Sequence, residues 1–249
     1  MKIEKYAAVS ATHIGRVREE NQDCILFCPE YDFFAVSDGM GGVLYGKKSA
    51  IMACESMKEV AAKVWDRYQR DKDIRHAASS LKEGLERISD YISQEGNTES
   101  YIRFGATFCG VMILDEYSIW INIGDSRGYL LTDYGKSLRQ ITVDHNMAQL
   151  VVSKGKMTRE EADKTDLGYQ LLNFVGMDVP AEADVFITAN RKKTQIILCS
   201  DGLYGMTGDR EMGRIVSSTK NMERACRRLI CAANARGGKD NISVVLIRT

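Results

Sequence analysis

The order of strand-like and helix-like patterns along the chain constrains the fold more than any other feature of the sequence. Residues 49–68 and 73–94 carry apolar side chains at three- and four-residue spacing, which predicts two long amphipathic helices in succession. Shorter runs rich in Val, Ile and aromatic residues predict strands at 6–10, 33–37, 106–114, 118–123, 127–131, 185–188, 195–199 and 242–247. Because strands group with strands and helices with helices, we expect an α+β fold of two antiparallel sheets covered by helices.

Turn and stop signals refine this arrangement. The pair Gly96-Asn97 predicts the end of the second long helix. The consecutive strands within 106–131 predict a meander, with its first turn at Asp115-Glu116. Two more helices are predicted before the final strand, at 211–216 and 222–234.

Length and composition indicate one ordinary globular domain over residues 1–249. Hydrophobic residues make up 44% of the chain and charged residues 27%, and the two prolines provide no Pro-rich linker. Lys+Arg and Asp+Glu both number 34, so the formal net charge is zero. A nucleic-acid partner is therefore not expected, because binding to a phosphate backbone requires clustered cations.

The sequence favours a cytoplasmic protein. No apolar stretch approaches the roughly 20 residues that cross a bilayer, and the first residues lack the apolar core of a signal peptide. The seven cysteines form no CxxC pair and no framework spacing, which indicates reduced thiols in a reducing compartment. We expect no membrane partner and a monomer.

Residues 144–182 differ from the rest of the chain. They are polar and weakly periodic, with short helical patterns at 147–153 and 159–163. A long irregular insertion in a compact domain is usually a lid or a binding segment. We therefore expect 144–182 to form a flap that contributes to the choice of substrate.

Aspartates stand at the ends of predicted strands, each next to Gly, Ser or Asn. A carboxylate placed just past an apolar strand is held rigidly and still reaches the rim of the sheet. Several carboxylates on one rim would repel one another unless cations neutralised them, and oxygen ligands favour Mg²⁺ or Mn²⁺ over Zn²⁺. The candidates are Asp38, Asp125, Asp201 and Asp240.

The same aspartates have a plainer interpretation. Asp-Gly is a common turn dipeptide, so any single one of these elements is weak evidence for a metal site. Four of them at strand boundaries argue against turn chemistry alone. Their spacing does not establish that they converge in space.

Seven short motifs follow one another along nearly the whole chain. No one of them is decisive, but in this order and spacing they resemble the metal-dependent 2C-type protein phosphatases, particularly the bacterial stand-alone form. That resemblance implies a central β-sandwich of two antiparallel sheets flanked by helical layers (α-β-β-α). The motifs are 12–23 (THIGRVREENQD), 37–42 (SDGMGG), 104–107 (FGAT), 124–127 (GDSR), 142–145 (TVDH), 200–203 (SDGL) and 238–242 (GKDNI).

The resemblance also implies roles at the metal site. Asp38 would bridge two divalent cations, and the carbonyl of Gly39 would complete one coordination sphere. Asp201 and Asp240 would hold the second cation, while Asp23 would orient a metal-bound water from outside the ligand set. Two such cations lower the pKa of a water and neutralise charge on the phosphoryl oxygens.

Two further residues carry implied roles with open alternatives. Arg18 stands where the family has its phosphate-binding arginine, whose guanidinium binds two phosphate oxygens at once. The alternative for Arg18 is a solvated surface arginine. Asp125, together with Asp201, would hold a third and weaker cation, and its alternative is a turn aspartate that caps a strand.

The function implied is a serine/threonine protein phosphatase that hydrolyses phosphoserine and phosphothreonine with a metal-activated water and two or three Mn²⁺ or Mg²⁺ ions. Its partners would be phosphorylated proteins and an opposing Ser/Thr kinase. The alternatives are a pseudophosphatase that only binds and a small-molecule phosphatase on the same fold. The chain departs from relatives at His13, where many have Asp, at Met40, where eukaryotic members have His, and at Gly205, where some have Asp or Asn.

Overall fold

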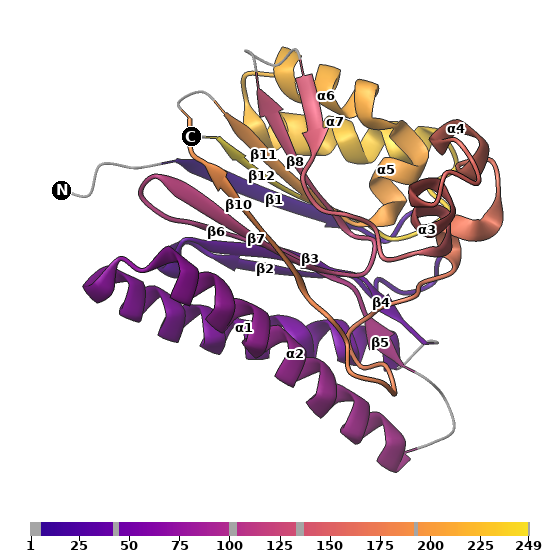
Figure 1. The fold of residues 1–249 in the computed structure, drawn as a ribbon. Helices are drawn as coiled ribbons and strands as arrows, with labels where there is room; N and C mark the ends of the chain where they lie inside the picture. The colour runs from indigo at the N-terminus through magenta and orange to yellow at the C-terminus, as the bar shows by residue number, and fades with distance from the viewer. Residues whose placement is uncertain (1–5, 42–44, 100–103, 133–136, 192–193, 249) are drawn as a thin grey trace.

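The computed structural model describes residues 6–41, 45–99, 104–132, 137–191 and 194–248. Residues 1–5 and 249 of the expected domain, and Gly42 of the second motif, lie outside these ranges. In the described residues two five-stranded sheets pack face to face, and every strand pairing within them is antiparallel (Figure 1). The predicted α+β sandwich is therefore confirmed.

Each sheet collects strands from distant parts of the chain. The first has the order β1 (Ala7–His13), β12 (Ile242–Arg248), β11 (Gln195–Cys199), β8 (Arg127–Thr132) and β9 (Ser137–Gln140). The second has the order β10 (Asp184–Ala189), β7 (Tyr117–Ile123), β6 (Phe108–Ile113), β3 (Phe33–Ser37) and β2 (Cys24–Cys28). A small ribbon joins β4 (Gly39–Met40) and β5 (Gly105–Ala106).

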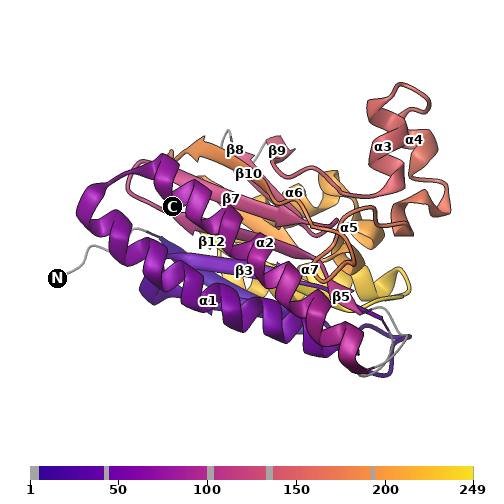
Figure 2. The ribbon, with the colours of Figure 1, turned by 60° about the horizontal axis from the view of Figure 1, so that its bottom comes forward.

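Helices cover the outer face of each sheet (Figures 1 and 2). The second sheet is covered by α1 (Tyr45–Asp71) and α2 (Ile74–Glu99). The first is covered by α5 (Asp201–Thr207), α6 (Asp209–Ser218) and α7 (Met222–Ala235). No helix in the described part of the chain is long and apolar enough to cross a bilayer.

Three apolar layers hold the sandwich together. One lies between α1, α2 and the second sheet, and another lies between the first sheet and α5 to α7. The third fills the space between the sheets, where Phe34, Trp120 and Leu198 are fully buried. Burying a large apolar side chain stabilises a fold by about 1.5–3 kcal/mol, so this central layer contributes strongly. Trp120 also donates its indole N–H to Thr188 Oγ1 at 2.9 Å.

The 144–182 segment connects β9 in one sheet to β10 in the other. It contains α3 (Met147–Ser153), α4 (Arg159–Ala162) and the 3₁₀ helix η3 (Asp166–Tyr169). The two short helices begin at side-chain caps, because Asn146 accepts from the backbone N–H of Gln149 and Thr158 forms a capping box with Glu161. Figure 2 shows α3 and α4 projecting from one end of the sandwich.

Three details differ from the sequence-based expectations. The second long helix runs through Gly96-Asn97 to Glu99. The low helix propensity of Gly and Asn is only a weak preference, and here it does not end the helix. The expected 106–114 strand is two strands, β5 and β6, separated at Thr107. The expected meander is wrong beyond β7, because β8 leaves the second sheet and pairs with β11 in the first.

That crossing determines where the site can form. The loop from β7 to β8 passes from one sheet to the other through Gly124, whose φ is +98°. A Cβ there would lie 2.7 Å from Thr107 Cβ, so a side chain is excluded both by the backbone conformation and by space. The next residue in this loop is Asp125.

Candidate metal centre

Asp38 and Asp201 meet although they follow strands of different sheets. Asp38 comes directly after β3, and Asp201 comes after β11 and begins α5. Because β3 and β11 end at the same end of the sandwich, the two carboxyl groups lie next to each other. The backbone N–H of Asp38 donates to Thr107 Oγ1 at 3.0 Å, which fixes the turn after β3.

Asp240 joins this pair from the loop before β12. Its Oδ1 accepts from the backbone N–H of Asn241 at 2.8 Å, and its Oδ2 accepts from Arg18 Nη2 at 2.7 Å. The side chain of Arg18 is 54% exposed, so one end of the guanidinium contacts Asp240 and the rest faces solvent. The hydrogen bond to Asp240 raises the pKa of Arg18.

Asp23 lies behind these residues. Its Oδ2 accepts from the hydroxyl of Ser200 at 2.8 Å, while its Oδ1 is buried and has no hydrogen-bond partner among the described residues. Burial, followed by the charges of Asp201 and Asp240, raises the pKa of Asp23 to about 7.

Together these carboxylates and Asp125 form what we call the acidic rim: Asp23, Asp38, Asp125, Asp201 and Asp240. Burial, followed by the neighbouring negative charges, raises the pKa of Asp38 well above its ordinary range. The same causes raise the pKa of Asp201 to about 6 and raise that of Asp125. Partly buried carboxylates that all resist ionisation favour the binding of a cation, because a cation offsets their mutual repulsion.

The donors of the acidic rim fit hard divalent cations. They are all oxygens, and both Asp23 Oδ1 and Asp201 Oδ1 are buried without a partner in the part of the chain described. Among the described residues, no three His, Cys, Asp or Glu side chains are arranged so that they could hold a metal ion by themselves. The rim is an open arrangement that needs backbone or solvent oxygens as well, as Mg²⁺ and Mn²⁺ sites commonly do.

Glycines allow the backbone to approach closely at two points of the rim. A Cβ on Gly39 would lie 2.2 Å from the carbonyl oxygen of Gly46, at the start of α1. A Cβ on Gly202 would lie 2.0 Å from the carbonyl oxygen of Asn241. Glycine at these positions brings β4 against α1, and α5 against the loop that carries Asp240.

Asp125 is 7% exposed and is held by its loop. The neighbouring Ser126 hydroxyl hydrogen-bonds to Thr107 Oγ1 at 2.6 Å, the same oxygen that accepts from the backbone of Asp38. On the other side, the N–H of Gly124 donates to His145 Nδ1 at 3.2 Å. The hydrogen bond to His145 therefore holds the Asp125 loop against the 144–182 segment.

A cavity of about 670 Å³ opens beside the rim. Asp125, Asp201, Asp240 and Arg18 line one side, and residues of the 144–182 segment line another. The structure thus brings together all six side chains that the sequence singled out for the site, and the backbone of Gly39 lies at the same end of the sandwich.

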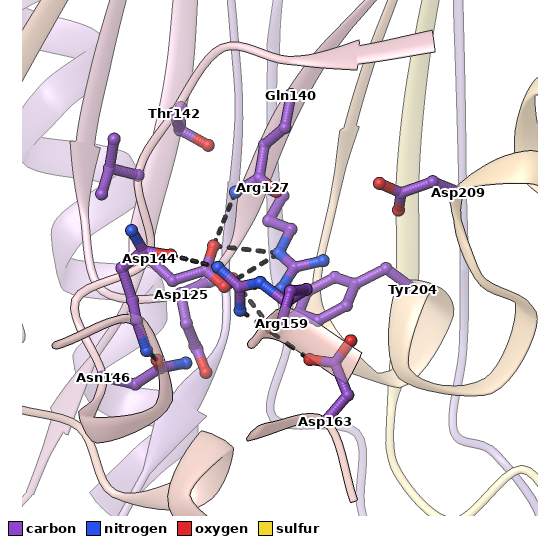
Figure 3. Close-up of polar contacts among 12 residues, drawn as sticks. Asp125, Arg127, Gln140, Thr142, Asp144, Asn146, Arg159, Asp163, Tyr204 and Asp209 are labelled. Atoms are coloured by element: carbon purple, nitrogen blue, oxygen red, sulfur yellow. Dashed lines mark hydrogen bonds and ion pairs between the residues drawn. The ribbon is translucent and has the colours of Figure 1, made fainter. Parts of the chain in front are cut away.

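Three residues of the cavity wall had no role assigned from the sequence. Arg127 forms an ion pair with Asp144, and its guanidinium lies 3.6 Å from the centre of the Tyr204 ring (Figure 3). Arg127 and Asp144 lie in two of the seven motifs, which was a signal that could have been used. The two residues are 17 positions apart, one before β9 in the sequence and one after it, so only the fold reveals their contact.

Comparisons with known proteins identify the family of this chain. Residues 11–241 match the family described as protein phosphatase 2C. The serine/threonine phosphatase stp of Listeria monocytogenes is 28% identical over 240 residues, which are 95% of this chain and 93% of that protein. The PPM Ser-Thr phosphatase MsPP from Mycobacterium smegmatis, in complex with cacodylate, has a TM-score of 0.80 and 26% identity over 97% of each chain.

A further solved structure supports the fold. The catalytic domain of the serine threonine protein phosphatase PstP, in complex with two manganese ions, has a TM-score of 0.82. It is 24% identical and covers 98% of this chain and 97% of its own.

The sandwich and its acidic rim define a phosphatase of the metal-dependent class. Within that class, this chain belongs to the protein phosphatase 2C family, because the family match covers most of its length. The predictions of family and of serine/threonine protein phosphatase activity are confirmed by the family match and by these relatives.

Proposed function

We propose that this protein hydrolyses phosphoserine and phosphothreonine with Asp38, Gly39, Asp201 and Asp240 holding two divalent cations and Arg18 binding the phosphate. The observation that carries the proposal is the acidic rim, in which Asp23, Asp38 and Asp201 have raised pKa values and two carboxylate oxygens are buried without a partner among the described residues. When bound, the cations supply a water nucleophile near neutral pH and neutralise charge on the phosphoryl oxygens.

The protein's own side chains perform the remaining tasks. Arg18 reaches the mouth of the cavity, where its guanidinium can donate two parallel hydrogen bonds to phosphate oxygens. Asp23 Oδ1 can accept a hydrogen bond from a water at the rim and so orient it. During hydrolysis a bond forms from the water oxygen to phosphorus, and the bond to the serine or threonine oxygen breaks. Met40 cannot donate a proton to that oxygen, so the proton comes from water or from another group.

Phosphothreonine-peptide hydrolysis by the purified protein tests this proposal, with Mn²⁺, with Mg²⁺ and with EDTA. Asp38→Ala and Asp201→Ala should each lower kcat by at least about 100-fold, as expected when charge stabilisation of the transition state is lost. Asp90→Ala is the matched control, since Asp90 is an exposed carboxylate on α2. It should retain the activity of the unmodified protein.

The results also separate the alternatives. A folded protein without turnover in either ion would favour a binding module. Efficient cleavage of an aryl phosphate, combined with negligible kcat/KM on phosphopeptides, would favour a small-molecule phosphatase. Activity that survives both Asp38→Ala and Asp201→Ala would refute the assignment of the metal ligands.

The biological setting is also part of the proposal. All seven cysteines are free, which suits a reducing compartment such as the cytoplasm, where the enzyme would act as a monomer and oppose a Ser/Thr kinase in signalling. The residues form one phosphatase domain over 1–249. The 144–182 segment, which lines the cavity, is the flap that selects among phosphoprotein substrates.

A further inference from the structure

Tyr204 connects two parts of the acidic rim that are distant in sequence. It lies in α5, the helix that begins with Asp201, and its hydroxyl donates to the backbone carbonyl oxygen of Asp125 at 3.0 Å. One hydrogen bond therefore links the helix that carries Asp201 to the crossing loop that carries Asp125.

The Tyr204 ring is held in place from the other side. The Arg127 guanidinium lies 3.6 Å from the ring centre, a contact in which the cation faces the negative face of the aromatic ring. Arg127 is itself fixed by Asp144, with Nε to Oδ1 at 2.9 Å and Nη2 to Oδ2 at 2.5 Å (Figure 3). The Arg127 and Asp144 side chains are 12% and 1% exposed, so this support is nearly removed from solvent.

The Tyr204 hydroxyl contacts the backbone of Asp125 and so leaves the carboxylate oxygens of Asp125 available. Asp125 and Asp201 line the same cavity. The hydrogen bond from Tyr204 therefore fixes how far the loop that carries Asp125 lies from the helix that begins at Asp201.

We propose that Tyr204 is a positioning residue that sets the separation between the Asp125 and Asp201 carboxylates, and with it the affinity of a cation held by both. This inference rests on the proposed function, in which Asp125 contributes to a third and weaker cation site. In this role Tyr204 acts through the backbone of Asp125.

Two phenol-to-phenyl variants test the inference. Tyr204→Phe keeps the ring under Arg127 and removes only the hydroxyl. Tyr129→Phe is the matched control, because the buried Tyr129 hydroxyl donates to Asp209 at 3.0 Å and accepts from Arg127 at 3.1 Å without contacting Asp125. Mn²⁺ binding is followed by electron paramagnetic resonance, and the thermal midpoint in EDTA reports whether each variant folds.

We expect Tyr204→Phe to bind the two tighter Mn²⁺ ions as before and to raise the dissociation constant of the weakest by about three- to tenfold. That range follows from the net contribution of one hydrogen bond. Tyr129→Phe should leave all three constants unchanged. Equal constants in Tyr204→Phe and the unmodified protein, or equal losses in both variants, would overturn the inference.

The variant Asp125→Asn shows whether a negative result refutes only the role of Tyr204 or also the third cation site on which that role rests. If Asp125→Asn weakens the third ion and Tyr204→Phe does not, only the positioning role is wrong. If Asp125→Asn leaves Mn²⁺ binding unchanged, the third site and the positioning role are both refuted. Loss of the two tighter ions in Asp38→Ala would still support the proposed function in that case.

Discussion

Replacing Arg127 by methionine should destabilise the protein through the carboxylate that it leaves behind. Asp144 is 1% exposed and accepts from Arg127 at 2.5–3.1 Å. Arg127→Met preserves much of the side-chain volume and removes the charge, so Asp144 becomes a buried anion without its cation. Removing one partner of a buried ion pair typically costs about 3–5 kcal/mol.

The structure favours the lower end of that range. Gln140 Nε2 still donates to Asp144 Oδ1 at 2.7 Å after the substitution. We therefore expect a loss of about 3 kcal/mol in the free energy of unfolding, equivalent to a fall of roughly 6–12 °C in Tm for a chain of this length. Adding Asp144→Leu removes the stranded charge, and the double variant should regain at least about 2 kcal/mol over Arg127→Met.

Urea unfolding at pH 7 in EDTA, followed by tryptophan fluorescence, measures these differences. The slope of the free energy of unfolding against urea concentration should be the same in all variants, because unfolding exposes nearly the same surface in each. A cost below about 1 kcal/mol for Arg127→Met would refute the reasoning. The reasoning would also be refuted if the double variant lost as much free energy of unfolding as Arg127→Met and Asp144→Leu lose separately, added together, since the two charges would then be uncoupled.

Three further outcomes are expected. Burial raises the pKa of Asp23 to about 7 and the pKa of Asp201 to about 6. In EDTA the contribution of these two groups to the free energy of unfolding is therefore complete below about pH 4 and is lost as the pH rises through 6–7. A urea midpoint that rises over this pH window would contradict the expectation. Gly202→Ala should cost about 1–3 kcal/mol by calorimetry, whereas Gly205→Ala in the same helix, which has open space, should gain about 0.5–1 kcal/mol. Arg18→Lys should lower kcat/KM for a phosphopeptide by about tenfold, mainly through KM, with an unchanged Tm, and a lowered Tm would indicate a structural role.

The features that the sequence could predict are those that local patterns determine. Residues 33–37 form β3 at the predicted bounds, because a run of buried side chains is bounded by Asp32 and Asp38. The two long helices follow from their apolar spacing. The strand-end position of Asp38 and Asp201 also followed from such patterns, and the family resemblance predicted that they meet.

Features that depend on distant partners were missed. Strand β9 contains a single apolar side chain, Leu138, and is a strand because it pairs with β8 at the edge of the sheet. Nothing local indicates that β8 changes sheets, since its partner β11 lies far along the chain. The bond from Tyr204 to Asp125 depends on the same crossing, so no pattern within either segment could have predicted it.

The attachment of the 144–182 segment has an evolutionary consequence. It leaves from β9 and returns into β10, which are outermost strands of different sheets. Lengthening or replacing its middle, residues 147–169, would therefore interrupt no interior strand pairing, and a longer loop adds little to the entropy cost of closing it. Substrate preference can then diversify between relatives by exchange of this stretch alone, while Asp144 and His145 continue to hold the loop that carries Asp125.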